Sequence, residues 1–323
     1  MPSVDTVTGP VDAAELGLTL IHEHFFSADE VVSRQWPLMA DPARAYELAR
    51  ASAEAVKRHG VQTVVDPTAA MLGRDVRALA QLSADTGLRI VACTGIYTYD
   101  QLPRFLASRS ADFMAELFIG DLQAGIQGTD IRAAFIKCAA DEAGMTRGVQ
   151  KVHRAAARAS LATGAPIMAH SHPATRTGLA QAELFLEEGV AADKIHIAHT
   201  GDTDDLDYIE SLLSLGVYAG LDRYGLDYLL PTAGRNAVAL ELLRRGHAER
   251  LFLSQDFSVP IAAGLAWFTP EQMERSRASG ATPDWSMTFL FETVIPQLRR
   301  GGLSTGDLET LMRENPRRWL GGA

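Results

Sequence analysis

The strongest constraint on the fold is a series of eight short apolar runs separated by amphipathic stretches. The runs occupy residues 18–24, 62–66, 89–95, 132–138, 165–170, 194–200, 216–222 and 250–256. Most are apolar throughout instead of alternating between apolar and polar residues, which is typical of parallel strands buried on both faces. The chain is therefore expected to build a parallel sheet that helices cover.

The stretches between the runs carry the signals of helices. They occupy residues 41–59, 74–86, 101–122, 146–163, 177–188, 204–215 and 233–245. The first begins with Asp41 and Pro42, a favourable helix start, and stops at Gly60. This alternation predicts an α/β protein, a (β/α)8 TIM barrel. An open doubly wound sheet is the alternative, but no glycine-rich phosphate loop follows the first run.

Composition sets further limits. A hydrophobic content of 47% is ample for one large core, and no repeat or linker is visible, so one domain over residues 1–323 is expected. The net charge of −10 argues against nucleic acid or an anionic membrane as partner. The N-terminus shows no signal peptide and no run is long enough to span a membrane, which predicts a cytoplasmic protein. Cys93 and Cys138 are then expected to be buried, reduced thiols.

The ends of the predicted strands carry polar residues. In a TIM barrel the catalytic groups lie at the C-terminal strand ends. Here these ends are His22, His24, Lys137, His170, His199 and Asp256. His22 and His24 are two residues apart, so both imidazoles point to one face of a strand. Because buried polar groups need partners, we expect a shared metal centre. His196 is expected on the opposite face from His199, against a helix.

Lys137 is the unusual member of this set. It lies in a strand of apolar and small residues, where burial near imidazoles and cations disfavours an ammonium group. One interpretation is a lysine that reaches solvent or pairs with an acid such as Asp141. The other is carboxylation of its amine by carbon dioxide, which converts a cation into an anion with two oxygens.

Five motifs follow one another along the chain: Thr19-Leu-Ile-His-Glu-His24, Phe135-Ile-Lys137, Ala169-His-Ser-His172, Ala198-His-Thr-Gly-Asp202 and Leu253-Ser-Gln-Asp256. In this order and spacing they resemble the phosphotriesterase family of the amidohydrolase superfamily, and within it the phosphotriesterase-like lactonases. The resemblance covers nearly the whole length, from Val4 to the segment that ends at Trp319 and Leu320.

The resemblance implies two divalent metal ions per chain. His22, His24 and the axial ligand Asp256 would hold the more buried ion, and His170 and His199 the more exposed one. Carboxylated Lys137 and a hydroxide would bridge the pair. Two cations lower the pKa of a shared water enough to give a nucleophile at neutral pH, and Asp256 would accept its proton. Zinc is favoured, with cobalt, iron and manganese as alternatives.

The same resemblance implies a lactone substrate. Tyr97 follows the third run and Arg223 the seventh; in the lactonases the tyrosine lies against the lactone ring and the arginine orders the neighbouring loop. After the last run, residues 257–285 begin as an apolar segment with Phe257, Trp267 and Phe268. This segment would line a channel for an acyl chain or pack against a partner subunit.

We therefore predict a lactonase acting on N-acyl homoserine lactones, as in quorum quenching, with weak phosphotriesterase activity on the side. A true phosphotriesterase, or a sugar-lactone or carboxylic ester hydrolase, is the alternative on the same site. A non-catalytic scaffold is the rival from another class, but it would not need all six ligand types. The family resemblance also implies a homodimer, for which Trp36, Tyr99 and Phe105 would provide surface.

Overall fold

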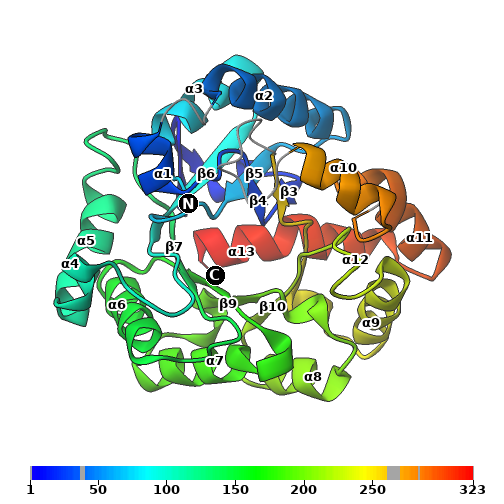
Figure 1. Ribbon diagram of the computed structural model, residues 1–323. Helices are drawn as coiled ribbons and strands as arrows, with labels where there is room; N and C mark the ends of the chain where they lie inside the picture. Colours follow the sequence, from blue (N-terminus) through cyan, green and yellow to red (C-terminus); the bar gives the residue numbers. More distant parts are fainter. Residues whose placement is uncertain (1, 37–40, 260–269, 283, 323) are drawn as a thin grey trace.

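Eight parallel strands form the centre of the molecule, and helices surround them (Figure 1). The computed structural model describes residues 2–36, 41–259, 270–282 and 284–322. Neighbouring strands follow the order β11-β10-β9-β8-β7-β6-β5-β3, so the predicted α/β barrel is confirmed. The strands are β3 (Thr19–Leu20), β5 (Thr63–Asp66), β6 (Arg89–Gly95), β7 (Phe135–Ala139), β8 (Ile167–His170), β9 (Ile195–Ala198), β10 (Tyr218–Leu221) and β11 (Leu251–Leu253).

Two short strands join the ends of this sheet. β4 (Glu23–His24) continues the chain beyond β3, β12 (Phe257–Ser258) continues it beyond β11, and the two pair in parallel. The amide of Asp256 also donates to the carbonyl of His22 at 3.1 Å, and that of Val259 donates to His24 at 2.9 Å. The first and last barrel strands therefore meet at their C-terminal ends, where the predicted metal ligands lie.

Helices alternate with the strands and form the outer layer. They are α1 (Glu30–Gln35), α2 (Pro42–Arg58), α3 (Val76–Thr86), α4 (Arg104–Ala107), α5 (Ala111–Gln123), α6 (Arg147–Thr163), α7 (Thr177–Glu187), α8 (Leu206–Ser214), α9 (Thr232–Arg244), α10 (Pro270–Ala278), α11 (Ile295–Arg300), α12 (Thr305–Glu309) and α13 (Asn315–Gly321). The single helix predicted over residues 101–122 is wrong. Ser110 caps α5 by accepting a hydrogen bond from the amide of Phe113, so the chain starts a new helix there.

The barrel interior is filled from below by apolar side chains. Val91, Phe135, Met168 and Phe252 point inward and pack with Trp319 of α13, all of them buried. α13, drawn in red, crosses the end of the barrel in Figure 1, and the hairpin of β1 (Ser3–Thr6) and β2 (Gly9–Asp12) packs beside it. A closed lower end leaves the opposite rim for polar groups.

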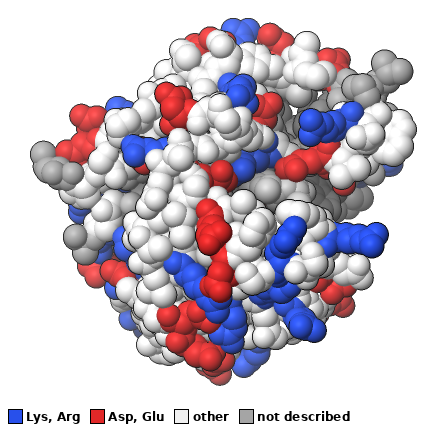
Figure 2. All heavy atoms as spheres, turned by 90° about the vertical axis from the view of Figure 1, so that its left-hand side faces the viewer, with Lys and Arg blue, Asp and Glu red and all other residues white. Residues whose placement is uncertain are grey.

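Charged side chains of both signs cover the outer helices. Arg158 of α6 bonds to Asp112 of α5 at 2.6 Å, and Arg176 bonds to Asp205 at 2.7 Å. The face in Figure 2 likewise carries basic and acidic side chains together. Among the described residues, no helix has the length and apolar character that crossing a membrane requires.

Candidate metal centre

The six predicted ligands lie on one rim of the barrel. His22 follows β3, His24 ends β4, Lys137 lies within β7, His170 ends β8 and His199 follows β9, while Asp256 lies between β11 and β12. All are buried except Asp256, whose side chain is 13% exposed. The strand-end rule therefore brings these side chains to one place from six segments of the chain.

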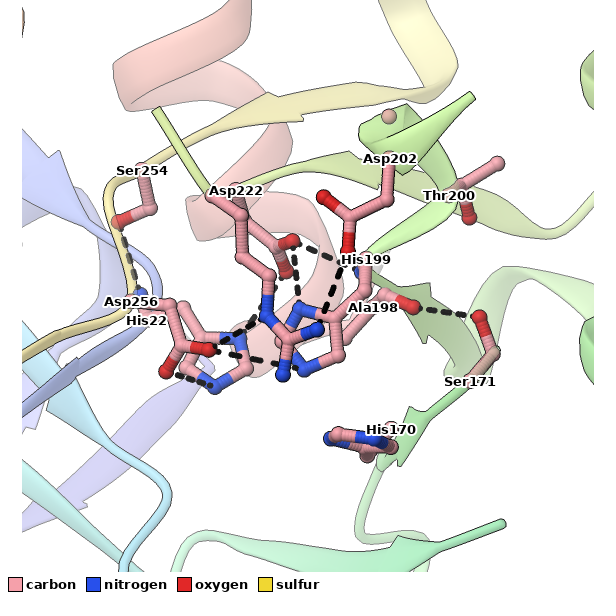
Figure 3. A network of polar contacts seen from close by, with 12 residues as sticks. His22, His170, Ser171, Ala198, His199, Thr200, Asp202, Asp222, Ser254 and Asp256 are labelled. Carbon is pink, nitrogen blue, oxygen red and sulfur yellow. Dashed lines mark hydrogen bonds and ion pairs between the residues drawn. The ribbon is translucent and has the colours of Figure 1, made fainter. Parts of the chain in front are cut away.

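Asp256 lies at the centre of this group (Figure 3). Its Oδ1 is 3.3 Å from Nε2 of His22 and 3.2 Å from Nε2 of His24, and its Oδ2 is 3.8 Å from Nε2 of His199. Donor atoms of His22, His199 and Asp256 all lie within 4.8 Å of one another, a spacing that could hold a metal ion.

Nδ1, the other ring nitrogen of each of these histidines, is hydrogen-bonded to a side chain on the side away from Asp256. Asp222 binds Nδ1 of His22 through Oδ2 and Nδ1 of His199 through Oδ1, each at 3.0 Å, and Oδ1 also accepts the amide of His199 at 2.8 Å. Nδ1 of His24 lies 2.7 Å from the hydroxyl of Thr68. A carboxylate behind Nδ1 fixes the proton there and leaves Nε2 free to bind a cation.

The sequence argument missed Asp222, although one signal was present. Asp222 ends the seventh apolar run, and the same strand-end rule that selected His170 would have selected it. It is fully buried, and although burial alone would raise its pKa, His199 and His22 hold that pKa well below its ordinary value. Asp222 is therefore an anion at neutral pH that touches two predicted ligands at once.

His170 uses its nitrogens differently. Its Nδ1 is 3.0 Å from the hydroxyl of Tyr97 and its Nε2 is 2.8 Å from Oδ2 of Asp141. Its ring lies 4.4 Å from that of His199, so it stands beside the other ligands but outside the tightest group (Figure 3). A carboxylate thus holds one ring nitrogen of His170 as Asp222 does for His22, but on His170 it is Nε2 and not Nδ1.

Lys137 is fully buried, and its Nζ lies 3.4 Å from Nε2 of His22. Burial lowers the pKa of this amine to about 8, with Asp256 and Asp222 opposing the shift. The predicted alternative partner Asp141 bonds to His170 instead. Within the described part of the chain, Lys137 thus forms no ion pair with a carboxylate.

Three imidazoles of this site, those of His22, His170 and His199, are neutral at physiological pH. Burial, followed by Lys137, lowers the pKa of His22 to about 4, and burial lowers that of His170 to about 3. Burial would raise the pKa of Asp256, but His22, His24, His199 and Arg223 hold it well below its ordinary value. Neutral imidazoles around an ionised carboxylate are the protonation states that bind a divalent cation.

Glu23 holds the backbone that presents Asp256. Its Oε1 accepts the hydroxyl of Ser254 at 2.7 Å and the amide of Gln255 at 3.0 Å, and its Oε2 accepts the amide of Phe257 at 2.8 Å. Asp256 between them has φ of 51°, in the left-handed region that non-glycine residues rarely adopt. The buried side chain of Glu23, whose pKa burial raises to about 8, therefore stabilises through these hydrogen bonds an unfavourable turn that directs Asp256 into the site.

His196 differs from its expected orientation. It also points into the barrel, where its ring lies 4.7 Å from that of Phe252 and 5.7 Å from that of Trp319. The expectation of the opposite face is wrong because His199 has φ of 65°, which breaks the alternation of the strand.

A cavity of about 180 Å³ opens beside the ligands. Tyr97, Arg223, His24 and Asp256 line it. Arg223 donates through Nε to Asp256 at 2.9 Å and through Nη1 to Asp202 at 3.0 Å. Tyr97 and Arg223, selected from the resemblance, thus lie next to Asp256 and His170.

The residues predicted to contact an acyl chain are only partly visible. Phe257 packs edge-on against Trp285 at 5.1 Å, and Trp285 lines the cavity. Trp267 and Phe268 lie outside the described residues. A role of these three aromatic residues in substrate binding stays a prediction.

The sequence and the fold of this chain are similar to those of known proteins. A sequence model of the phosphotriesterase family matches residues 2–320. An aryldialkylphosphatase from Saccharolobus solfataricus is 41% identical over 310 residues, 96% of each chain. A phosphotriesterase homology protein from Mycobacterium tuberculosis is 37% identical over 326 residues, covering 98% of this chain and 97% of the relative. The solved structure of the phosphotriesterase from Mycobacterium tuberculosis superposes with a TM-score of 0.92 at 37% identity, covering both chains completely.

Proposed function

The chain belongs to the phosphotriesterase family of hydrolases, and from that premise we propose that it is a metal-dependent lactonase that opens the ring of N-acyl homoserine lactones. The observation that carries the proposal is the position of Tyr97 and Arg223. Both line the cavity that Asp256 and His24 also line, and both contact the predicted ligand set directly.

The donor set fits two divalent ions. His22, His24 and Asp256 would hold one of them, His170 and His199 the other, with zinc favoured over cobalt, iron and manganese. Lys137 would be carboxylated and join the two. Lys137 is a buried amine beside His22 and forms no ion pair with a carboxylate among the described residues. This supports the proposal, because carboxylation would supply an anion between the two ions.

Lys137→Ala tests the carboxylated lysine. The variant should lose bound metal and activity together, and a short carboxylic acid in the buffer should partly restore both by replacing the missing anion. A variant that kept two metal ions and normal turnover would exclude this role.

The proposed mechanism needs a proton acceptor and a proton donor beside the lactone. Asp256 and Tyr97 fill these two roles, and Arg223 orients Asp256. When bound, two divalent ions would polarise the ester carbonyl and lower the pKa of water. Asp256 accepts the proton of the attacking water at its carboxylate, and the Arg223 guanidinium keeps that carboxylate oriented. Burial raises the pKa of Tyr97 well above its ordinary value, so its hydroxyl stays protonated and can donate to the ester oxygen.

This arrangement suits a lactone better than an aryl phosphotriester. The leaving group of a lactone is an alkoxide, a strong base that needs a proton to depart, whereas an activated phenolate leaves without one. Asp256 and Tyr97 therefore help the lactone reaction more. Phosphotriester hydrolysis remains the second candidate, because a 41% identical relative is named an aryldialkylphosphatase.

Apolar walls support an acyl substituent on the lactone. Leu72, Leu226 and Trp285 line the same cavity as Tyr97 and Arg223 and offer apolar surface to such a chain. Tyr99, predicted above as dimer surface, also bonds to Tyr97 at 2.7 Å, and its part in a dimer stays a prediction. Trp36 and Phe105 are each 57% exposed, and we propose that they contribute to a homodimer contact.

A substrate panel tests the proposal. We expect kcat/KM to be highest for a long-chain N-acyl homoserine lactone, lower for a short γ-lactone and lowest for an aryl phosphotriester. Metal content is measured on the same preparation. Efficient phosphotriester hydrolysis without turnover of either lactone would replace the lactonase with the second candidate.

A further inference from the structure

Two serine hydroxyls form a pair on the wall of the cavity. Ser27 follows β4 by three residues, Ser258 is the second residue of β12, and their Oγ atoms are hydrogen-bonded to each other. Ser258 is the register partner of His24 across the β4–β12 pair. The hydroxyl pair therefore lies directly beside a predicted metal ligand, and both serines line the same cavity as His24, Asp256 and Tyr97.

The two serine hydroxyls retain one unused O–H donor and unused acceptor lone pairs. Two hydroxyls carry two protons, and their mutual bond uses one of them. Among the described residues, neither hydroxyl has another hydrogen-bond partner. Ser27 is 1% exposed and lines the cavity. The pair thus offers the cavity one O–H donor together with free lone pairs.

The apolar side chains of the cavity make the serine pair selective for a ligand with a polar group at that position. Leu72 and Leu226 also line this cavity and offer no polar side-chain group, and the indole N–H of Trp285 already donates to the carbonyl of Gln255 at 2.9 Å. In an apolar pocket, a few placed polar groups fix the orientation and identity of the ligand. A secondary amide has one N–H and one carbonyl, which matches one free donor and free lone pairs.

We propose that Ser27 and Ser258 bind the amide group that an α-acylamino lactone carries beside its ring. This inference rests on the proposed lactonase function and deepens it, because it assigns two residues to the amide group that distinguishes an N-acyl homoserine lactone from an alkyl lactone. The ring lies at Tyr97 and the metal ligands, the amide lies on the serine pair, and the aliphatic tail continues along the apolar wall.

The test compares two substrates that differ only in the amide. N-hexanoyl homoserine lactone carries it, and α-heptyl-γ-butyrolactone replaces it with two methylenes. Ser258→Thr keeps the hydroxyl, while Ser258→Val has nearly the same shape without it. Ser27→Ala removes the other hydroxyl. Ser108→Ala serves as control, because that hydroxyl bonds to the carbonyl of Phe105 on the surface.

We expect Ser258→Val and Ser27→Ala to lower the ratio of kcat/KM for the amide lactone over the alkyl lactone by roughly 3- to 10-fold, the range for one neutral hydrogen bond. Ser258→Thr and Ser108→Ala should keep the ratio of the unmodified protein. Equal losses on both substrates, or an unchanged ratio in Ser258→Val, would overturn the assignment.

The proposed function can fail separately. If the unmodified protein opens neither lactone, the lactonase proposal is lost. The serine pair is then tested by inhibition of aryl phosphotriester hydrolysis with the two corresponding lactams. A lower preference for the amide lactam in Ser258→Val supports the amide site, and an unchanged preference overturns it.

Discussion

Asp222→Asn should weaken metal binding unequally at the two halves of the site. The carboxylate of Asp222 accepts three hydrogen bonds, one from His22 and two from His199. An asparagine keeps one oxygen, and both bonds from His199 end on the same oxygen, Oδ1. The amide NH2 would therefore face Nδ1 of His22.

The consequence follows from the tautomer of His22. An NH2 donor facing Nδ1 requires a lone pair there, which moves the ring proton to Nε2, the nitrogen that faces Asp256 at 3.3 Å. A protonated Nε2 cannot bind a cation. Loss of such outer partners costs about 10- to 100-fold in metal affinity. We expect the upper end for the ion on His22 and the lower end for the ion on His199.

Metal content after dialysis against chelators of graded strength measures both affinities, and circular dichroism of the metal-free protein checks its folding. Thr68→Val is the matched control, because the Thr68 hydroxyl that it removes bonds to Nδ1 of His24 at 2.7 Å, so it should weaken one ion alone. Two ions per chain with unchanged chelator competition in Asp222→Asn would refute the reasoning. Equal weakening of both ions would refute the tautomer argument.

Three further substitutions test the site. In metal-free, carbon dioxide-free buffer, Lys137→Met should unfold with a free energy about 3 kcal/mol higher at pH 7, because the pKa of Lys137 falls from 10.5 to about 8 on folding. Between these two pKa values the unfolded chain binds more protons than the folded one, so the unmodified protein gains stability as the pH rises. The difference in free energy of unfolding between the two proteins, measured by urea denaturation, should therefore shrink towards pH 10.5. A difference that grows with pH contradicts this. Asp256→Asn should lower kcat by roughly 10²-fold or more in steady-state assays, and near-normal kcat with both metals bound would exclude its role. Glu23→Gln turns an NH2 towards groups that donate to Glu23, so it should lower the free energy of unfolding in urea by about 1–3 kcal/mol. An unchanged denaturation midpoint would show that the hydrogen bonds from Glu23 to the backbone around Asp256 are dispensable for stability.

Local sequence determined the barrel and the rim that carries the site. Apolar runs of strand length and capped helices depend on neighbouring residues alone, so strands such as β6 could be placed at their observed bounds. In parallel strands the C-terminal ends share one edge. His22, His170 and Asp256 were therefore predictable as neighbours, although more than 200 positions separate the first from the last.

Tertiary structure alone decided how those side chains are held. Asp222 reaches His22 across 200 positions and Thr68 reaches His24 across 44, contacts that depend on strand register and on how the barrel closes. The positive φ angles of His199 and Asp256 are likewise imposed from outside, at Asp256 by the carboxylate of Glu23. Hydrophobic periodicity carries no record of these bonds, because it reports which face of a strand is buried. Which nitrogen of a buried imidazole remains free to bind a metal depends on the atom behind it, and only the folded chain brings that atom there.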